Sequence, residues 1–247
     1  MTPAPRWTDS DFLSPSESLA PALLGQVLVR ILPDGTRLSG RIVEAEAYLG
    51  PQDLASHAAG GRRTHRNRHM YDGPGTSYVY FTYGMHHCFN IVCGARGHPL
   101  AVLIRALEPL EGVDRMRALR AAGSARVIAD TDLLRGPGRL CQGMGISLDD
   151  SGLDLGSDRS IWVERVERVE LGERAERAER AERVEWASGV GERVGVGPRI
   201  GIGGSHAWVE APLRWFVEGS PFVSHRRAPV GARRAGGSEH AQVARGG

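Results

Sequence analysis

The stretch that decides the fold is "GRIVEAEAYLGPQDLASHAAGG", residues 40–61. In it, two acids and an aromatic residue fall at alternate positions, Glu44, Glu46 and Tyr48. Side chains alternate between the two faces of a β-strand, so a strand here places these three on one face and the intervening alanines on the other. Strands usually turn apolar side chains inward, so this row of polar groups indicates a role other than core packing.

The composition is that of an ordinary soluble globular protein. The chain has 247 residues, 41% of them hydrophobic and 24% charged, which suits one large domain or two small ones. No apolar run approaches the roughly 20 residues that a membrane span needs. The N-terminus carries no secretory signal. We therefore expect a cytoplasmic protein with no membrane partner.

The cysteines and histidines do not predict a metal site. Cys88, Cys93 and Cys141 fit neither a disulfide framework nor a pair of zinc ligands, and the histidines show no ligand spacing. In a reducing compartment such thiols are ordinary buried apolar groups. The sequence gives no reason to expect a cofactor.

The basic residues are all arginine. The chain has no lysine, so the 31 residues counted as Lys+Arg are arginines. Mechanisms that need a lysine Schiff base or a P-loop lysine are therefore excluded. The net charge is only +2, but "GRRTHRNRH" at 61–69 holds four arginines and no acid. A local basic patch on a nearly neutral protein indicates a polyanion bound at one face.

Strands and helices are mixed along the chain without regular βαβ alternation, which predicts an α+β fold. A helix followed by a strand is expected over 18–32, and a hairpin turn at 33–35 leads into the strand that carries the two acids. Alternating strand formers follow at 76–84. The run "LAVLIRALEPL", 100–110, is apolar enough to be a central strand.

Several segments are expected to carry no chemistry. Residues 163–185 repeat Glu and Arg with a period of three, which matches neither the period of a helix nor that of a strand. We interpret this segment as part of an insertion, about 163–195, that forms a solvated helix or a disordered loop. Residues 1–10 are expected to be flexible, and 226–247 to be a disordered basic tail. These boundaries leave 11–225 as one domain.

The remaining residues suggest chemistry on a nucleic acid. A carboxylate among aromatic rings can act as a general base, and rings beside arginines suit base stacking with phosphate contact. Each part also has a structural interpretation. Glu44 can pair with an arginine such as Arg41 or Arg105, and His57 can be a hydrogen-bonded structural residue. Tyr78 and Tyr80 can be sheet packing, and the arginine cluster a solvated loop.

The order of these blocks is more specific than any one of them. "GRIVEAEAYLGPQDLASHAAGGRRTHRNRHMYDGPGTSYVYFTYGMHHCFNIV" and the later "LIRALEPLEG", "LLRGPGRLCQGMGI", "PRIGI" and "PLRWFVEGSPFVS" resemble the alkyladenine (3-methyladenine) DNA glycosylase family. The resemblance covers most of residues 19–224 and breaks only at the Glu/Arg repeat. It implies one compact domain with a curved mixed, mainly antiparallel sheet, flanking helices and a protruding DNA-intercalating β-hairpin.

The resemblance also implies the roles of individual residues. Glu46 matches the catalytic general base, and Arg105 matches an arginine near the catalytic water and the DNA backbone. Tyr83 matches the side chain that enters the minor groove and fills the gap left by the flipped nucleotide. The residues that match the walls of the base pocket are Tyr48, His57, Tyr80 and Asn90, the last of which would reject the guanine 2-amino group. The expected phosphate contacts are Arg62, Arg63, Arg66 and Arg68.

The function that follows from the resemblance is excision of alkylated or deaminated purines from double-stranded DNA, as in base-excision repair. The lesion classes are 3-methyladenine, 7-methylguanine, hypoxanthine and ethenoadenine. Glu46 would activate a water that attacks C1′ of the flipped nucleotide. Because the chain has no lysine, we expect a monofunctional enzyme that leaves an abasic site, working as a monomer without an obligate protein partner.

Two other functions compete with this one. Glu44 and Glu46 could be the carboxylate pair of a glycoside hydrolase, since alternate strand positions lie about 6.6 Å apart at Cα. That mechanism places its acids on opposite sides of the sugar, however, whereas these lie on one strand. A minor-groove DNA-binding module could keep the fold and Tyr83 without turnover. Loss of Glu46 would mark such a module, and Glu46 is present.

Overall fold

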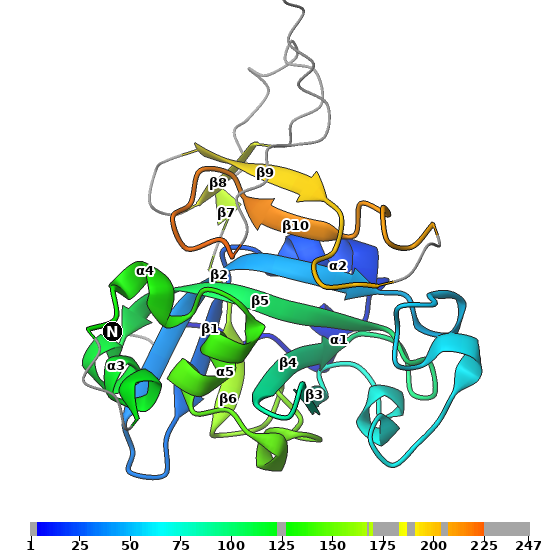
Figure 1. The fold of residues 1–247 in the computed structure, drawn as a ribbon, viewed down its shortest axis with the longest axis horizontal. Coiled ribbons are helices and arrows are strands. Elements are labelled where there is room, and N and C mark those ends of the chain that lie inside the picture. The colour runs from blue at the N-terminus through cyan, green and yellow to red at the C-terminus, as the bar shows by residue number, and fades with distance from the viewer. Residues whose placement is uncertain are drawn as a thin grey trace, which may run out of the picture.

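The computed structural model describes residues 4–122, 127–166, 168–169, 183–186, 191–203 and 207–224. A ten-stranded sheet runs through the molecule in the order β3-β4-β5-β2-β10-β9-β8-β7, with β1 beside β2 and β6 beside β1 (Figure 1). Every strand pairing in these residues is antiparallel. The α+β expectation is confirmed, and the described sheet is antiparallel rather than mixed.

The strands are β1 Val27–Ile31, β2 Arg37–Tyr48, β3 Ser77–Thr82, β4 His86–Val92, β5 Ala101–Glu111, β6 Ile161–Glu164, β7 Arg168–Val169, β8 Arg183–Trp186, β9 Gly191–Gly197 and β10 Arg214–Val217. The α-helices are α1 Asp9–Phe12, α2 Ser16–Leu23, α3 Val113–Ala121, α4 Asp130–Leu133 and α5 Pro137–Met144. Short 3-10 turns span Gly50–Gln52, Ala59–Gly61, Arg68–Tyr71 and Leu148–Asp150. The predicted helix–strand unit at 18–32 and the hairpin turn after it are confirmed by α2, β1 and the β1–β2 pairing.

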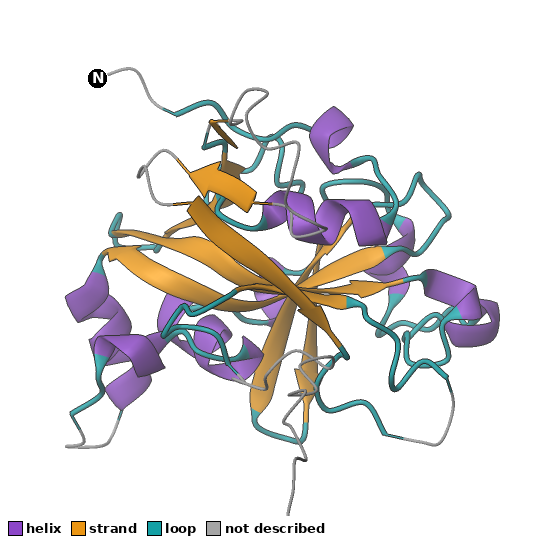
Figure 2. Cartoon of the chain, turned by 90° about the horizontal axis from the view of Figure 1, so that it is seen from above, coloured by secondary structure: helices purple, strands orange, loops and turns teal. Residues whose placement is uncertain are grey.

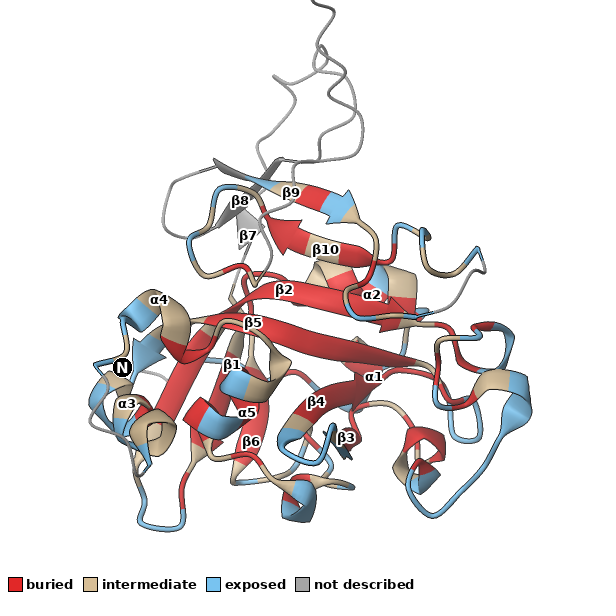
Figure 3. Cartoon of the chain, viewed as in Figure 1, coloured by how far each residue is buried: buried red, intermediate tan, exposed pale blue. Residues whose placement is uncertain are grey.

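Strand β2 organises the sheet because it has different neighbours along its length. Its first half pairs with β1, its second half pairs with β10, and β5 runs along its other edge. Seen from above, the strands cross one another instead of lying flat (Figure 2). The two central strands, β2 and β5, are buried over most of their length (Figure 3). Ala101–Leu107 of β5 is buried throughout. The prediction that 100–110 is a central strand is confirmed.

A bulge in the β2–β5 pairing divides core from site. Ile42 pairs with Leu107 and Ala45 pairs with Ile104, three residues further along in each strand, so the register passes over Arg105. A bulge lets residues three apart share one face, and all four of these paired residues belong to the main core cluster. The residues between them, among them Arg105, are thereby free to face the other way.

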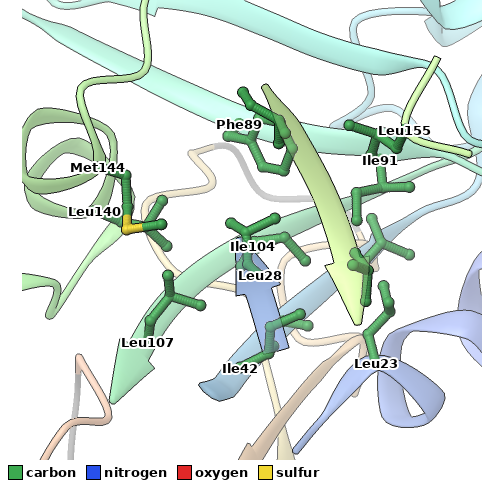
Figure 4. Packing of buried hydrophobic residues seen from close by; sticks show 14 of the residues in the cluster. Leu23, Leu28, Ile42, Phe89, Ile91, Ile104, Leu107, Leu140, Met144 and Leu155 are labelled. Carbon is green, nitrogen blue, oxygen red and sulfur yellow. The ribbon is translucent and has the colours of Figure 1, made fainter. Parts of the chain in front are cut away.

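The main core lies on the face toward which Ala45 and Ala47 point. Both alanines are fully buried and belong to the main cluster, so the predicted division of faces is confirmed. In Figure 4, Leu23 of α2 and Leu140 and Met144 of α5 pack near the aliphatic side chains of β2, β4 and β5. Small side chains on β2 allow close packing of this kind.

Residues 4–10 are more ordered than the sequence suggested. Trp7 is 5% exposed, its N–H donates to the Val163 carbonyl over 2.9 Å, and its indole donates to Gln26 over 3.2 Å. The Trp7 and Phe12 rings lie 5.4 Å apart. Two isolated aromatic residues in a polar segment show no periodicity, so the contact of Trp7 with β6 could not be read from the sequence.

The Glu/Arg insertion differs from the expected helix or loop at its ends. Residues 168–169 and 183–186 form β7 and β8, which pair with each other, and β8 also pairs with β9. Backbone pairing with a sheet edge does not require an apolar stripe, so a period of three does not prevent it. Residues 170–182 and the expected tail at 226–247 lie outside the described residues. In the part that is described, no helix is long and apolar enough to cross a bilayer.

Candidate active site

A cavity of about 880 Å³ opens where β2 and β5 meet the β3–β4 hairpin. Six of the side chains predicted from the sequence line it: Tyr48, His57, Tyr80, Tyr83, Asn90 and Arg105. The Glu46 carboxylate lies directly behind this lining, since it contacts Tyr48 and Arg105. Seven predicted residues, far apart in sequence, are therefore brought together in one place.

Glu46 is fully buried and has three polar contacts. Its Oε1 accepts the Ile200 N–H over 2.7 Å and lies 3.2 Å from Arg105 Nη1. Its Oε2 accepts the Tyr48 hydroxyl over 3.1 Å. Burial raises the pKa of Glu46 above its ordinary value, while the Arg105 charge and the Ile200 N–H act in the opposite direction. The result is a carboxylate that is more basic than usual and rigidly held.

Arg105 links the two acids of β2. Its Nε donates to Glu44 Oε1 over 3.3 Å, and its Nη1 faces Glu46. Arg214 also pairs with Glu44, at 2.9 Å. The interpretation of Glu44 as the partner of an arginine is therefore confirmed, with Arg105 rather than Arg41, which pairs with Glu108.

His57 and Tyr80 form one continuous wall of the cavity. Their ring centroids lie 4.5 Å apart in an edge-to-face arrangement. His57 Nδ1 lies 2.7 Å from the Tyr78 hydroxyl, so Tyr78 supports the wall from behind. Desolvation of the ring, followed by the nearby charge of Arg66, lowers the pKa of His57 to about 4. The imidazole is therefore neutral at physiological pH and presents an uncharged surface.

Tyr48 supplies an aromatic surface separate from that wall. The Arg199 guanidinium lies 4.6 Å from the Tyr48 ring centroid and covers one side of it. Arg199 is paired with Asp53, and both side chains are fully buried. Arg199 also donates to the Ala47 carbonyl over 2.9 Å. This support fixes the ring that donates its hydroxyl to Glu46.

Asn90 belongs to the buried floor of the site. It is 3% exposed, and its Nδ2 donates to the Tyr78 carbonyl over 2.9 Å and to the Cys88 carbonyl over 3.3 Å. Both acceptors are in the β3–β4 hairpin, so the amide is oriented by the same element that carries the tyrosine wall. The structure brings Asn90 to the cavity, and its role in selecting base edges stays a prediction.

Tyr83 lies at the tip of the β3–β4 hairpin. It is 81% exposed, and it is the only non-glycine residue with a positive φ, 50°, in the part of the chain that the structure describes. Met85 in the same turn is 68% exposed and Phe81 is 40% exposed. Exposed apolar side chains at a hairpin tip beside a cavity indicate a surface that meets a partner.

The arginine cluster lies beside the hairpin and does not line the main cavity. Its members Arg62, Arg63, Arg66 and Arg68 are all exposed. Arg66 donates to the Phe81 carbonyl over 2.7 Å and lies 5.5 Å from the Tyr80 ring centroid. Arg66 therefore anchors the loop to the strand that carries the pocket wall. The contact of these four arginines with phosphate stays a prediction.

Four residues of the site were not identified from the sequence: Asp53, Arg199, Ile200 and Arg214. Three are buried charges whose partners lie about 150 residues away or more, and the fourth acts through its backbone N–H. Neither kind of contact leaves a local signal. Among the described residues, no group of three or more His, Cys, Asp or Glu side chains could hold a metal ion.

Comparison with known proteins identifies a family for this chain. The family model for methylpurine-DNA glycosylase (MPG) matches residues 10–221. The chain is 46% identical over 217 residues to the DNA-3-methyladenine glycosylase of Homo sapiens, and 44% identical over 217 residues to that of Rattus norvegicus. These matches cover 86% of this chain but only 66% and 62% of the two mammalian proteins.

A bacterial relative is closer in length. The "putative 3-methyladenine DNA glycosylase" of Bacillus cereus (strain ATCC 10987 / NRS 248) is 39% identical over 209 residues, which are 84% of this chain and 93% of the relative. The family match includes every site residue named above. The chain belongs to the methylpurine-DNA glycosylase family.

Proposed function

We propose that this protein is a monofunctional DNA glycosylase that removes alkylated or deaminated purines from double-stranded DNA. The observation that carries the proposal is the buried Glu46 carboxylate, which lies directly behind an aromatic cavity and contacts Arg105. The names of the relatives, DNA-3-methyladenine glycosylases, support the substrate class. The lesions expected are 3-methyladenine, 7-methylguanine, hypoxanthine and ethenoadenine.

The first step is extrusion of the damaged nucleotide. A base inside a duplex cannot reach the cavity, and unstacking it costs a few kcal/mol, least for a damaged pair. Tyr83, at the exposed hairpin tip beside the cavity, enters the space that the base leaves and stacks there. The exposed arginines at 62–68 contact the phosphates on either side. DNA binding is therefore expected to weaken as salt rises.

The extruded base lies between the His57–Tyr80 wall and the Tyr48 ring. A cationic alkylated purine is attracted to electron-rich ring faces, by up to about 2 kcal/mol when desolvated. His57 does not oppose this attraction, because its pKa of about 4 leaves it neutral. Asn90 lies at the floor of the cavity and would meet the edge of the base, where it would exclude the 2-amino group of guanine.

Hydrolysis follows at the sugar. A water held by Glu46 attacks C1′ as the bond from C1′ to the base nitrogen breaks, and the base leaves with that electron pair. Glu46 takes the proton of the water. The Tyr48 hydroxyl and the Ile200 N–H orient the carboxylate, and Arg105 keeps it ionised. An alkylated purine is already a good leaving group, so the main need is a well-placed nucleophile.

The product is an intact abasic site. A lyase step needs an amine that forms a Schiff base with C1′, and this chain has no lysine. Treatment with borohydride during the reaction should therefore trap no covalent enzyme–DNA complex. A trapped complex would refute the monofunctional assignment without affecting the glycosylase assignment.

The experiment that tests the function is base release from duplexes that carry 1,N6-ethenoadenine, hypoxanthine or 3-methyladenine. The wild-type protein should release at least one of them, and Glu46→Gln should release none while still binding the lesion duplex. Glu108→Gln is the matched control, since Glu108 lies on β5 and pairs with Arg41 away from the cavity. Binding without release by the wild-type protein would instead support a non-catalytic DNA-binding module.

A further inference from the structure

We propose that Glu44 is a positioning residue for this reaction, which holds Arg105 and the segment at 198–200 in place around Glu46. The proposal rests on the proposed function, because it assigns Glu46 as the base. It concerns the one acid of the "EAEAY" run for which the reaction itself has no use. The structure shows a complete set of contacts that connect this acid to the catalytic carboxylate.

Glu44 is fully buried and is held by three donors from separate segments. Its Oε1 accepts Arg105 Nε of β5 at 3.3 Å and Arg214 Nη1 of β10 at 2.9 Å. Its Oε2 accepts the Ser224 N–H at 2.8 Å. A buried carboxylate is stable only when its charge is paired and its oxygens are hydrogen-bonded, and Glu44 meets both conditions. Because these three donors bind both of its oxygens, Glu44 acts through its neighbours.

The first path from Glu44 to Glu46 is the guanidinium of Arg105. Its Nε faces Glu44, its Nη1 lies 3.2 Å from Glu46, and its Nη2 lies 3.4 Å from Ser224 Oγ. Because the guanidinium is a planar fork of fixed geometry, a partner at Nε determines where Nη1 points. Without Glu44, Arg105 could turn and bind Glu46 through two nitrogens. A carboxylate paired in that way is a weaker base.

The second path is the Arg214 side chain. Its Nη1 binds Glu44, and its Nε donates to the Pro198 carbonyl over 2.9 Å. Pro198 lies two residues before Ile200, whose N–H donates to Glu46. Glu44 therefore helps to hold the backbone segment that supplies one of the hydrogen bonds of the catalytic carboxylate. Two independent paths from one buried acid converge on one reacting group.

The electrostatic environment of Glu46 agrees with this role. The charged and titratable groups that surround it are Glu44 and Tyr48 of β2, Arg105 of β5, Tyr80 of β3, Cys88 of β4, Arg214 of β10 and Arg199 with its partner Asp53. Burial is the largest cause of the raised pKa of Glu46, Arg105 lowers it, and the Glu44 charge raises it. Removing the Glu44 charge while Arg105 stays should therefore lower the pKa of Glu46.

The test compares Glu44→Gln with the wild-type protein by single-turnover base release over a range of pH. The acid limb of the pH–rate profile should move to lower pH, and the plateau rate should fall by up to about 100-fold, the scale of a misplacement of about 1 Å. Affinity for the lesion duplex should stay near the wild-type value, because Glu44 does not face the substrate. Glu108→Gln, which removes another β2–β5 ion pair, should change neither the limb nor the plateau.

A direct titration of Glu46 separates this proposal from the proposed function. The side-chain carboxyl carbon of Glu46 can be followed by 13C NMR without DNA, and its midpoint should be lower in Glu44→Gln than in the wild-type protein. An unchanged or higher midpoint would overturn the positioning role even if the enzyme is active. Absence of wild-type base release would instead contradict the function and leave the titration result standing.

A second variant covers the case in which Glu44→Gln does not fold. Glu44→Asp keeps the charge but shortens the side chain by one methylene. Its acid limb should stay at the wild-type pH while the plateau rate falls, because the contacts to Arg105 and Arg214 are displaced. A plateau rate equal to that of the wild-type protein would show that the exact placement of this carboxylate is irrelevant to the reaction, and would refute the proposal.

Discussion

Replacing Tyr83 by asparagine should separate the stability of the hairpin tip from its action on DNA. Tyr83 has a φ of 50°, and a left-handed backbone costs a residue of this kind about 1–2 kcal/mol. Asparagine adopts this conformation more readily. The ring is 81% exposed, so little packing is lost with it. The free energy of unfolding should therefore stay the same or rise by up to about 1 kcal/mol.

Base release should change in the opposite direction. Stacking of an aromatic side chain on bases is worth about 1–3 kcal/mol, which corresponds to about 5-fold to 150-fold. The single-turnover rate, or the affinity for the lesion duplex, should fall by a factor in that range. Tyr83→Phe, which keeps the ring and the strained backbone, should match the wild-type protein in both measurements.

Thermal unfolding and excess-enzyme base release on the same preparations provide the two readouts. If Tyr83→Asn is as stable as the wild-type protein but releases the base slowly from a duplex, its rate should return to the wild-type value on a lesion in single-stranded DNA. There the flipped base leaves no gap in a duplex for the ring to fill. Base release by Tyr83→Asn at the wild-type rate would refute the wedge role. A marked fall in its melting temperature would refute the assignment of strain to Tyr83.

Three further predictions concern titratable and charged groups of the site. The His57 ring should be neutral at pH 6 by 15N NMR and titrate near pH 4. Because the folded pKa of His57 is below the unfolded value, the stability that it contributes is present above about pH 6.5 and is lost as the pH falls toward 4. The pKa of Glu46 is raised instead, so the stability that it contributes is present at low pH and is lost as pH rises through the folded value. The melting temperature of Glu46→Gln minus that of the wild-type protein should accordingly increase as the pH rises above the ordinary carboxyl value of 4.5, and a flat difference would contradict the raised pKa. Arg199→Met should lower the free energy of unfolding by about 3–5 kcal/mol in denaturant titrations, because it leaves Asp53 buried and unpaired. A higher free energy of unfolding in the double variant with Asp53→Leu would confirm the cause. A decrease below about 1 kcal/mol in Arg199→Met would contradict it.

The face of β2 could be predicted because a strand has a simple period. Alternation alone placed Glu46 and Tyr48 together and the alanines in the core, and the structure agrees. The position of Arg105 relative to these acids could not be predicted in the same way. It depends on a bulge that shifts the β2–β5 register, and a bulge is a property of two strands that lie far apart in sequence.

The support of Tyr48 shows a second limit. Arg199 and Asp53 look like ordinary surface residues in the sequence, yet both are fully buried and paired. Charged residues are rarely buried unless they are paired, and the pairing depends on the tertiary structure. The same limit explains Trp7, whose burial is caused by β6 and Gln26 and not by any pattern in its own segment.

The two acids of "EAEAY" show how one local pattern can carry two different roles. Glu44 and Glu46 are both fully buried, share Arg105 and differ by a single strand repeat. Glu44 is also held by Ser224 and Arg214, whereas Glu46 is held by Tyr48 and Ile200. A glycoside hydrolase places its two carboxylates on opposite sides of the sugar, whereas these two lie on one strand and share Arg105. Their difference lies in which segments reach each acid, so it follows from the tertiary structure and not from the order of residues along β2.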